Sequence, residues 1–200
     1  MDQTTLMVIA AVVVLIVAIA LISMIVRRGR SQRLKSRFGP EYDRTVQATG
    51  NRGKAERELE SRQKRREQLD IRPLDPGLRD RYAREWMQVQ ADFVDAPSDA
   101  VRRADQLVTQ VMRERGYPTD NFEQRSSDVS VDHPRVVDEY RAAQKISMAN
   151  RENRASTEDL RQAMRHYRSL FDDLLGKTEI TDQSESTAGR RERPRREGGQ

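Results

Sequence analysis

The side chains best suited to acid–base or metal chemistry are two histidines and three pairs of adjacent acids. The histidines are His133 and His166. Neither has a carboxylate or a second histidine at the spacing of a metal-binding motif. The chain has no cysteine, which excludes a disulfide framework, a thiolate metal site and a thiol nucleophile. We therefore expect structural roles for both histidines, and no metal site or cofactor.

The paired acids do not indicate a catalytic site either. They are Asp138-Glu139, Glu158-Asp159 and Asp172-Asp173. Adjacent side chains on a helix point about 100° apart, so such pairs do not converge on one substrate atom. The segment GNRGKA, residues 50–55, resembles a phosphate-binding loop but lacks its four-residue spacer and its Ser/Thr after the lysine. We predict no catalytic residue, and the protein is not expected to be an enzyme.

A dense basic cluster is the other chemically distinctive feature. The stretch VRRGRSQRLKSR, residues 26–37, has six basic side chains and no acid. Each Lys or Arg near an anionic leaflet contributes about 1 kcal/mol to lipid binding. The cluster is therefore a candidate contact for lipid headgroups, although a role in setting membrane topology alone is the simpler interpretation and the one we favour. Its members are Arg27, Arg28, Arg30, Arg33, Lys35 and Arg37.

An apolar run comes directly before this cluster. It extends from Leu6 to Val26, after a short N-terminal extension of residues 1–5. Its length corresponds to about 31 Å of helix, close to the roughly 30 Å hydrocarbon thickness of a bilayer. We predict that residues 6–26 form a single transmembrane helix, because a lone span satisfies its backbone only as a helix.

The position of the basic residues predicts the orientation of this span. Lys and Arg next to a span stay preferentially on the cytoplasmic side. We therefore expect an inner-membrane protein with its N-terminus outside and its bulk in the cytoplasm. A cleaved signal peptide is the alternative, since Ala18-Ile19-Ala20 has the spacing of a cleavage site. The acidic N-terminus and the continuation of the run to Val26 disfavour it.

Nucleic-acid binding is not favoured despite an isoelectric point near 9.8. Residues 70–176 have 17 basic against 20 acidic side chains, so the predicted domain lacks the basic face that phosphate binding requires. A nucleic-acid role would depend on the stalk or on the arginines of the tail. Those arginines are Arg190, Arg191, Arg193, Arg195 and Arg196.

Amphipathic periodicity places a small antiparallel helical bundle in residues 70–176. Apolar residues recur every three or four positions from Leu78 to Phe93, from Val101 to Met112, from Val136 to Ile146 and from Leu160 to Leu174. We expect only a short helical turn around Phe122, with the third helix starting at residues 132–134. The fold class is all-α.

Less apolar segments flank this bundle. Residues 27–53 are expected to form a basic juxtamembrane linker, with a break at Gly39-Pro40. Residues 54–69 alternate acids and bases, which indicates a charged helix or stalk that buries little. Residues 177–200 contain almost nothing to bury, and we predict a disordered tail.

Several short sequence motifs give the chain a resemblance to a known family. They are RFGPEYDR (37–44), IRPL (71–74), YAREW (82–86), RGYP (115–118), VDHP (131–134) and STEDLRQAMRHYRSLF (156–171). In these the chain resembles an uncharacterised family of bacterial single-pass membrane proteins, over about residues 34–176. The resemblance implies a membrane-tethered helical domain and assigns no reaction, cofactor or site residue.

These features favour a membrane-tethered interaction or scaffold module that binds a protein partner. The alternatives are an anionic-lipid surface sensor acting through the basic cluster, and a membrane-tethered nucleic-acid binder. The sequence leaves the oligomeric state open, since the span has alanines but no GxxxG motif.

Overall fold

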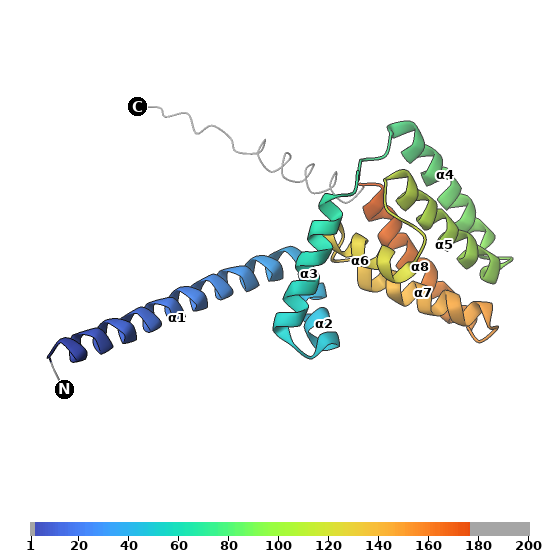
Figure 1. Cartoon of the computed structure of the whole chain (residues 1–200). Coiled ribbons are helices and arrows are strands. Elements are labelled where there is room, and N and C mark those ends of the chain that lie inside the picture. The colour runs from blue at the N-terminus through green and yellow to red at the C-terminus, as the bar shows by residue number, and fades with distance from the viewer. Residues whose placement is uncertain (1–2, 177–200) are drawn as a thin grey trace, which may run out of the picture. The chain divides into compact units, whose positions relative to one another are not determined.

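The computed structural model describes the backbone of residues 3–176. Within the first helix it describes the side chains of residues 7, 15–19, 21–25 and 28 onward. Every regular element in the described residues is a helix, and there are eight of them (Figure 1). The all-α prediction is therefore confirmed. The chain divides into two compact units, one ending at Ser61 and the other starting at Arg62. Residues 177–200, predicted to be disordered, lie outside the described residues.

The first unit begins with one long helix, α1, Gln3–Phe38. Its 36 residues correspond to a length of about 54 Å. The apolar run and the basic cluster lie on this one helix, with no break between them. Among the residues whose side chains are described, no helix is long and apolar enough to cross a membrane. The predicted span, residues 6–26, includes residues 6, 8–14, 20 and 26, whose side chains lie outside that description.

Residues 27–53, expected as a linker, are mostly helical. The end of α1 is followed at Gly39 by α2, Pro40–Thr49, and then by α3, Arg52–Glu67. Helix α1 contributes a short buried apolar stripe, Leu34 and Phe38, to this unit. The buried side chains contributed by α2 and α3 are Tyr42, Ala55 and Leu59. The predicted stalk is therefore a helix that buries part of one face.

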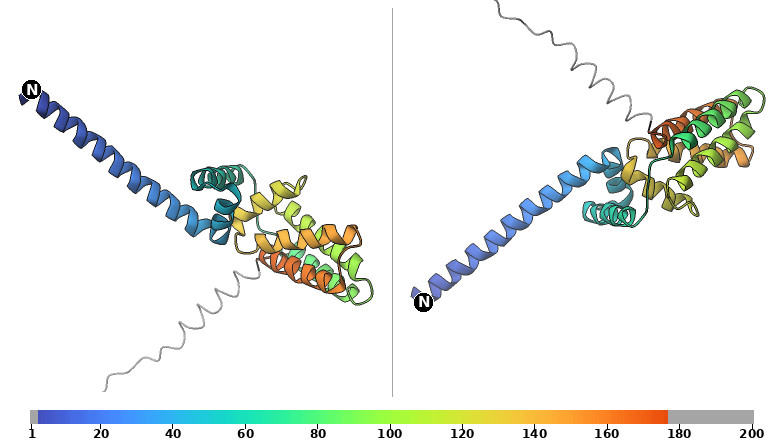
Figure 2. Two further views of the ribbon diagram at one scale, coloured as in Figure 1. Left: turned by 90° about the horizontal axis from the view of Figure 1, so that it is seen from below. Right: turned by 90° about the horizontal axis from the view of Figure 1, so that it is seen from above.

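The second unit contains the bundle that the periodicity predicts. Its long helices are α4, Pro76–Asp92; α5, Pro97–Glu114; α7, Val137–Arg151; and α8, Thr157–Leu174. These four lie side by side in the views of Figures 1 and 2. Helices α4 and α8 start at side-chain caps. Asp75 accepts a hydrogen bond from the Gly77 amide at 2.8 Å, and Ser156 forms a capping box with Asp159.

Aromatic and aliphatic side chains from all four long helices fill the bundle core. Trp86 of α4 stacks on Phe171 of α8 with ring centroids 4.7 Å apart. Tyr140 of α7 meets Tyr167 of α8 edge to face at 6.3 Å. Such pairs stabilise a core beyond the area they bury, by about 0.5–1.5 kcal/mol each. The bundle is thus held by contacts between helices that are far apart in the sequence.

A fifth helix of this unit, α6, is longer than the sequence indicated. It spans Phe122–Asp132, where we expected only a turn, and the third predicted helix, α7, begins at Val137 rather than at residues 132–134. The physical reason is that most of the side chains that α6 buries are polar, including Arg125, Ser126 and Asp128, so its apolar pattern is too sparse to predict a helix.

The predicted turn at residues 115–118 is present and needs its glycine. Gly116 has φ 98°, and a Cβ at this position would lie 2.2 Å from the carbonyl oxygen of Asp70. The Tyr117 amide folds back to donate to the Met112 carbonyl at 3.0 Å. Only glycine fits here, because the residue is both left-handed and in contact with another backbone.

Candidate functional site

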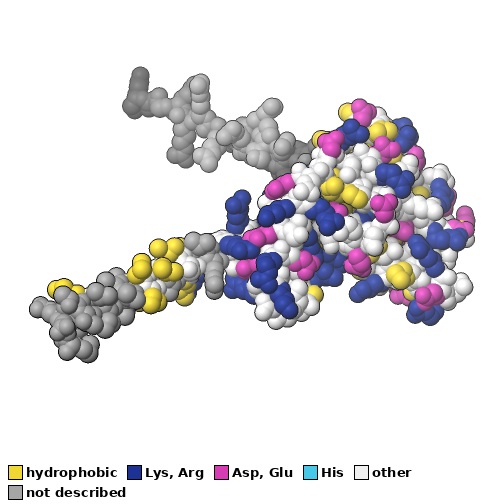
Figure 3. Space-filling view, in the orientation of Figure 1, with side chains coloured by type: hydrophobic (Ala, Val, Ile, Leu, Met, Phe, Trp, Pro, Cys, Tyr) yellow, Lys and Arg dark blue, Asp and Glu magenta, His cyan; other side chains and the backbone are white. Residues whose placement is uncertain are grey.

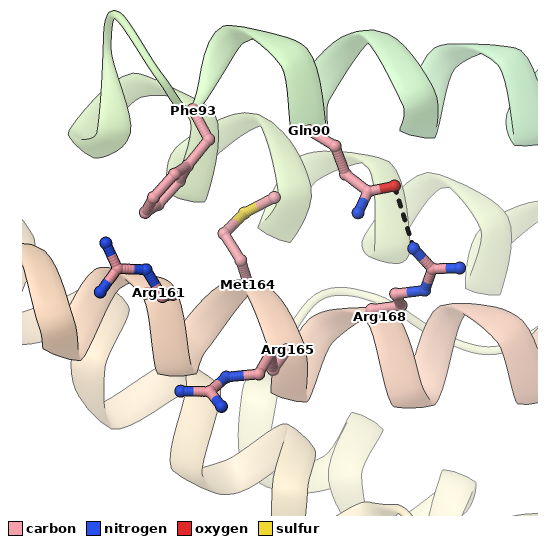
Figure 4. A pocket seen from close by; sticks show the side chains of 6 residues that line it. All are labelled: Gln90, Phe93, Arg161, Met164, Arg165 and Arg168. Carbon is pink, nitrogen blue, oxygen red and sulfur yellow. Dashed lines mark hydrogen bonds between the residues drawn. The ribbon is translucent and has the colours of Figure 1, made fainter.

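A solvent-open groove lies between α4 and α8. It encloses about 200 Å³ and is lined by side chains of both helices (Figure 4). Helix α4 supplies Gln90 and its C-cap residue Phe93, whereas α8 supplies an apolar residue and three arginines. The α8 residues are Arg161, Met164, Arg165 and Arg168.

Helical spacing explains why three arginines meet at this groove. Arg161, Arg165 and Arg168 follow one another at intervals of four and three residues, so they lie along one flank of α8. This flank borders the apolar stripe of α8 that packs into the core, and Met164 belongs to both. The amphipathic pattern of the helix therefore places cationic side chains directly beside apolar surface.

The floor of the groove is apolar. Met164 is 8% exposed and belongs to the core, while Phe93 is partly buried against that core. In Figure 4 both side chains point into the space between the two helices. Methionine is unbranched and adapts to different shapes, which suits a surface that accepts an incoming apolar side chain.

The groove arginines are paired with few acids and remain exposed. Arg161 and Arg165 share Glu158, the latter at 3.2 Å, and Arg168 lies 3.2 Å from Asp172. Two acids therefore face three cations. The arginine side chains are 55%, 67% and 51% exposed. Because exposed ion pairs contribute only about 0–1 kcal/mol, an incoming carboxylate can replace them.

Arg168 also links the two walls of the groove. Its Nη1 donates to Oε1 of Gln90 across the gap at 3.2 Å (Figure 4). The planar guanidinium of arginine can bind a carboxylate with two parallel hydrogen bonds. Together with the apolar floor, these groups match a peptide segment that has acidic side chains next to an apolar one.

The predicted lipid-contact residues lie on the C-terminal part of α1. Arg28, Arg33 and Arg37 are exposed, whereas Arg30 forms an ion pair with Glu60 of α3 and Lys35 lies 3.6 Å from Asp43 of α2. The side chain of the sixth residue, Arg27, lies outside the described residues. Lys and Arg side chains gather around this part of the first unit (Figure 3).

A carboxylate stands at the centre of the first unit. Glu56 of α3 accepts hydrogen bonds from the hydroxyl of Ser31, from the Tyr42 hydroxyl at 2.8 Å and from Arg52 Nε at 3.1 Å. Burial raises the pKa of Glu56, but these hydrogen bonds together outweigh it, so its pKa lies below the ordinary value. Sequence periodicity did not identify this site, because its residues come from three helices.

The structure places His133 in a saturated hydrogen-bond network. Arg115 Nη1 lies 3.2 Å from His133 Nε2 and also donates to the Leu174 carbonyl at 3.0 Å. Since arginine only donates, Nε2 must accept, and we assign the proton to Nδ1, which donates to Asp173. Both ring nitrogens are thereby occupied, and the imidazole ties the ends of α5 and α8 together.

The other candidate acid–base residues lie apart. His166 is half-buried, with Nδ1 4.0 Å from a carboxylate oxygen of Glu139. Within the acid pair of α8, Asp172 faces Arg168 while Asp173 faces His133. Among the described residues, no group of three or more His, Asp or Glu side chains is arranged to hold a metal ion.

Sequence reasoning also missed a polar cluster inside the bundle. Arg125 of α6 donates from Nε to the Tyr140 hydroxyl at 2.7 Å, and Asp105 of α5 lies 3.2 Å from Arg151 of α7. Burial raises the pKa of Asp105, although Arg125 and Arg151 act in the opposite direction. Burial likewise raises the pKa of Tyr140 to about 12. The sequence feature that could have indicated this cluster is the run of polar residues in α6, EQRSSD at 123–128.

Comparison with known proteins adds no assignment to these sites. No protein-family model, curated protein or solved structure matches the chain. The family resemblance drawn from the short sequence motifs therefore stays a prediction.

Proposed function

We propose that this chain is a membrane-tethered helical interaction module. The groove between α4 and α8 would bind an acidic segment of a protein partner, and α1 would hold the bundle at the cytoplasmic face of the inner membrane. The groove carries the proposal, because it combines apolar floor residues with cations that exposed acids only partly neutralise. The proposed role is binding rather than catalysis.

The tether is supported by the surface of α1. Its described large apolar side chains between Leu15 and Ile25 are about half exposed or more, including Ile16 at 61% and Ile25 at 70%. A contiguous exposed apolar surface of this kind marks a membrane or protein contact. The basic cluster that follows on the same helix favours the cytoplasm for the rest of the chain.

Site-specific photocrosslinking in cells tests the groove. A benzophenone amino acid at Gln90 lies in the groove, whereas the same residue at Gln88 lies about 200° away around α4 and serves as the matched control. We expect a discrete intermolecular product from position 90 alone. The product should disappear when Arg165→Glu and Arg168→Glu are combined, because the incoming carboxylates lose their partners.

Charge reversal elsewhere provides a second control. Arg135→Glu changes an exposed arginine outside the groove and should leave the product unchanged. Equal products from positions 88 and 90, or a product that survives reversal of the groove arginines, would show that α4 and α8 are not the binding surface.

A second candidate function is sensing of anionic lipid through the basic cluster. Arg28, Arg33 and Arg37 are exposed on a helix that continues from the apolar run without a break. Reconstitution of the full chain in nanodiscs tests this. Trypsin cleavage at residues 28–37 should slow when phosphatidylglycerol is added to phosphatidylcholine, and added salt should reverse the effect because exposed charges are screened.

The control for lipid sensing is a chain with Arg33→Gln and Arg37→Gln. Its remaining cleavage sites should depend less on the anionic lipid. Equal cleavage of the unmodified chain in neutral and anionic nanodiscs would exclude lipid sensing and leave the cluster a role in topology alone.

A further inference from the structure

The tail of the chain begins at the end of the helix that carries the groove arginines. The last described residue, Gly176, follows α8 directly and has φ 72°. Its amide donates to the Asp173 carbonyl at 3.0 Å, which closes the helix with a left-handed residue. Such an ending turns the chain off the helix axis and lets it return along the helix.

Gly176, where the tail leaves the bundle, lies on the line of contact between α4 and α8 that also contains the groove. We call this line the α4–α8 seam. A Cβ at Gly176 would be 3.8 Å from Nη2 of Arg79, which is in the first turns of α4. Along this seam α4 and α8 meet in reverse order, since Trp86 stacks on Phe171 and Gln90 bonds Arg168. The tail therefore leaves the bundle at one end of the α4–α8 seam, and the groove lies further along it.

Arg79, the arginine beside Gly176, has a hydrogen-bond donor without a partner in the part of the chain that the structure describes. The Nε of Arg79 is buried and has no hydrogen-bond partner among the described residues. A buried donor without a partner is unfavourable, and an acceptor bound to the same guanidinium offsets part of that cost. A carboxylate of the tail would meet the guanidinium of Arg79 first and the groove arginines next.

The distances allow the tail to reach the whole groove. Along α8, Arg168 is about 12 Å and Arg161 about 22 Å from Gly176 at 1.5 Å per residue. An extended chain covers about 3.3 Å per residue, so Ile180 comes level with Arg168 and Gln183 with Arg161.

The charge of the first part of the tail is complementary to the groove. Residues 177–185 read KTEITDQSE, with three acids, one lysine and a single isoleucine. The arginines of the tail all come later, from Arg190 onward. Only the segment nearest α8 therefore combines carboxylates with an apolar side chain, the chemistry that the groove fits.

We infer that residues 179–185 of this chain dock in the α4–α8 groove and compete with the partner for it. Glu179, Asp182 and Glu185 pair with the arginines of the seam, and Ile180 packs toward its apolar floor. This inference rests on the proposed function, because it makes the groove self-occupied until a partner displaces the tail. The contacts are exposed ion pairs, so the tail is held weakly and exchanges readily.

Disulfide trapping in the full chain tests the docking. The chain has no native cysteine, and Thr181 follows Ile180, which comes level with Arg168 and therefore with Gln90, so Gln90→Cys with Thr181→Cys is an unambiguous pair. The control pair is Gln88→Cys with Thr181→Cys, which has the same tether length, but position 88 faces away from the groove. We expect the intramolecular disulfide to form about tenfold faster at position 90, because docking raises the local concentration of the tail there.

Charge substitutions separate docking from simple proximity. Glu179→Gln, Asp182→Asn and Glu185→Gln together should reduce the rate at position 90 to that of the control pair, as should 1 M salt. Equal rates for the two pairs in the unmodified chain, or a rate unaffected by removal of the acids, would overturn the inference.

Failure of docking is distinguishable from failure of the proposed function. In cells, the photocrosslink from position 90 to a partner should increase when the three tail acids are neutralised. A partner product that appears but does not change refutes competition and leaves the module intact. A fast disulfide at position 90 without any partner product supports the tail contact and counts against the partner.

Discussion

Two single residues in this protein are strongly constrained, Gly116 by a backbone contact and Glu56 by hydrogen bonds to its side chain. Gly116 combines a left-handed conformation with contact to the Asp70 carbonyl, and this contact joins the end of α5 to the segment that leads into α4. Glu56 holds three helices of the first unit through three donors. Each of these positions supports a prediction about stability.

We expect Gly116→Ala to destabilise the bundle by about 2–4 kcal/mol, through strain and through the clash of the new Cβ with Asp70. Chemical denaturation followed by the fluorescence of Trp86 measures this. Arg135→Ala is the control, because Arg135 is an exposed residue of the same unit and its truncation leaves the backbone conformation unchanged. An equal loss of stability in both variants would contradict the assignment.

The Glu56 site predicts acid sensitivity of the first unit. Its folded-state pKa lies below the ordinary 4.5, so its stabilising effect is complete above that value and is lost as the pH falls through the folded pKa. Hydrogen exchange of residues 52–61 should accelerate below about pH 4.5 in the native chain, beyond its intrinsic pH dependence.

Glu56→Gln is the comparison that isolates this carboxylate. The variant should exchange faster at neutral pH and should lack the additional acceleration on acidification. The same acid response in both chains would show that Glu56 is not its source.

At the scale of elements, the sequence predicts helices with an apolar stripe and misses helices with a polar one. The apolar stripes of α5 and α8, and the N-cap residue Ser156 of α8, allowed both helices to be predicted from the sequence. Helix α6 buries Arg125 and Asp128 instead, and its partners Tyr140 and Thr119 come from other segments. No local pattern reports such a pairing, because it exists only after the chain has folded.

We predict that α6 depends on its buried arginine. Arg125→Ala should cost about 2–4 kcal/mol, because the Tyr140 hydroxyl and the Thr119 carbonyl lose a charged donor in the interior. Arg135→Ala, at an exposed position, should stay within about 0.5 kcal/mol of the native stability. Urea denaturation measures both, and similar values would show that the buried network contributes little.

The candidate groove was also beyond sequence reasoning. Met164 and Phe93 lie in the apolar stripes predicted for two different helices, and no sequence pattern singled out the arginines beside them. Their meaning depends on α4 and α8 packing side by side, which brings Gln90 opposite Arg168. The basic cluster of α1, in contrast, was visible at once because its residues are neighbours in the sequence.

At the scale of the whole molecule, the two units have separate cores. The bundle core extends from Leu74 to Leu175, whereas Phe38, Tyr42, Ala55 and Leu59 are buried in the first unit. We therefore expect independent responses to mutation. Glu56→Gln should accelerate hydrogen exchange in residues 28–61 and leave residues 76–174 unchanged, and Arg125→Ala should do the reverse. Acceleration throughout the chain in either variant would indicate one cooperative unit.

The unbroken α1 also fixes a rotational phase between its two ends. Ser31, Leu34 and Phe38 of α1 are buried in the first unit. Because the helix is continuous, the direction in which each residue of the apolar run points depends on how many residues separate it from this buried stripe. One alanine inserted after Gly29 would turn the apolar run by about 100°, whereas seven inserted residues would restore the phase to within about 20°. Because α1 has no break, the direction in which its apolar end faces is coupled to the packing of its other end in the first unit.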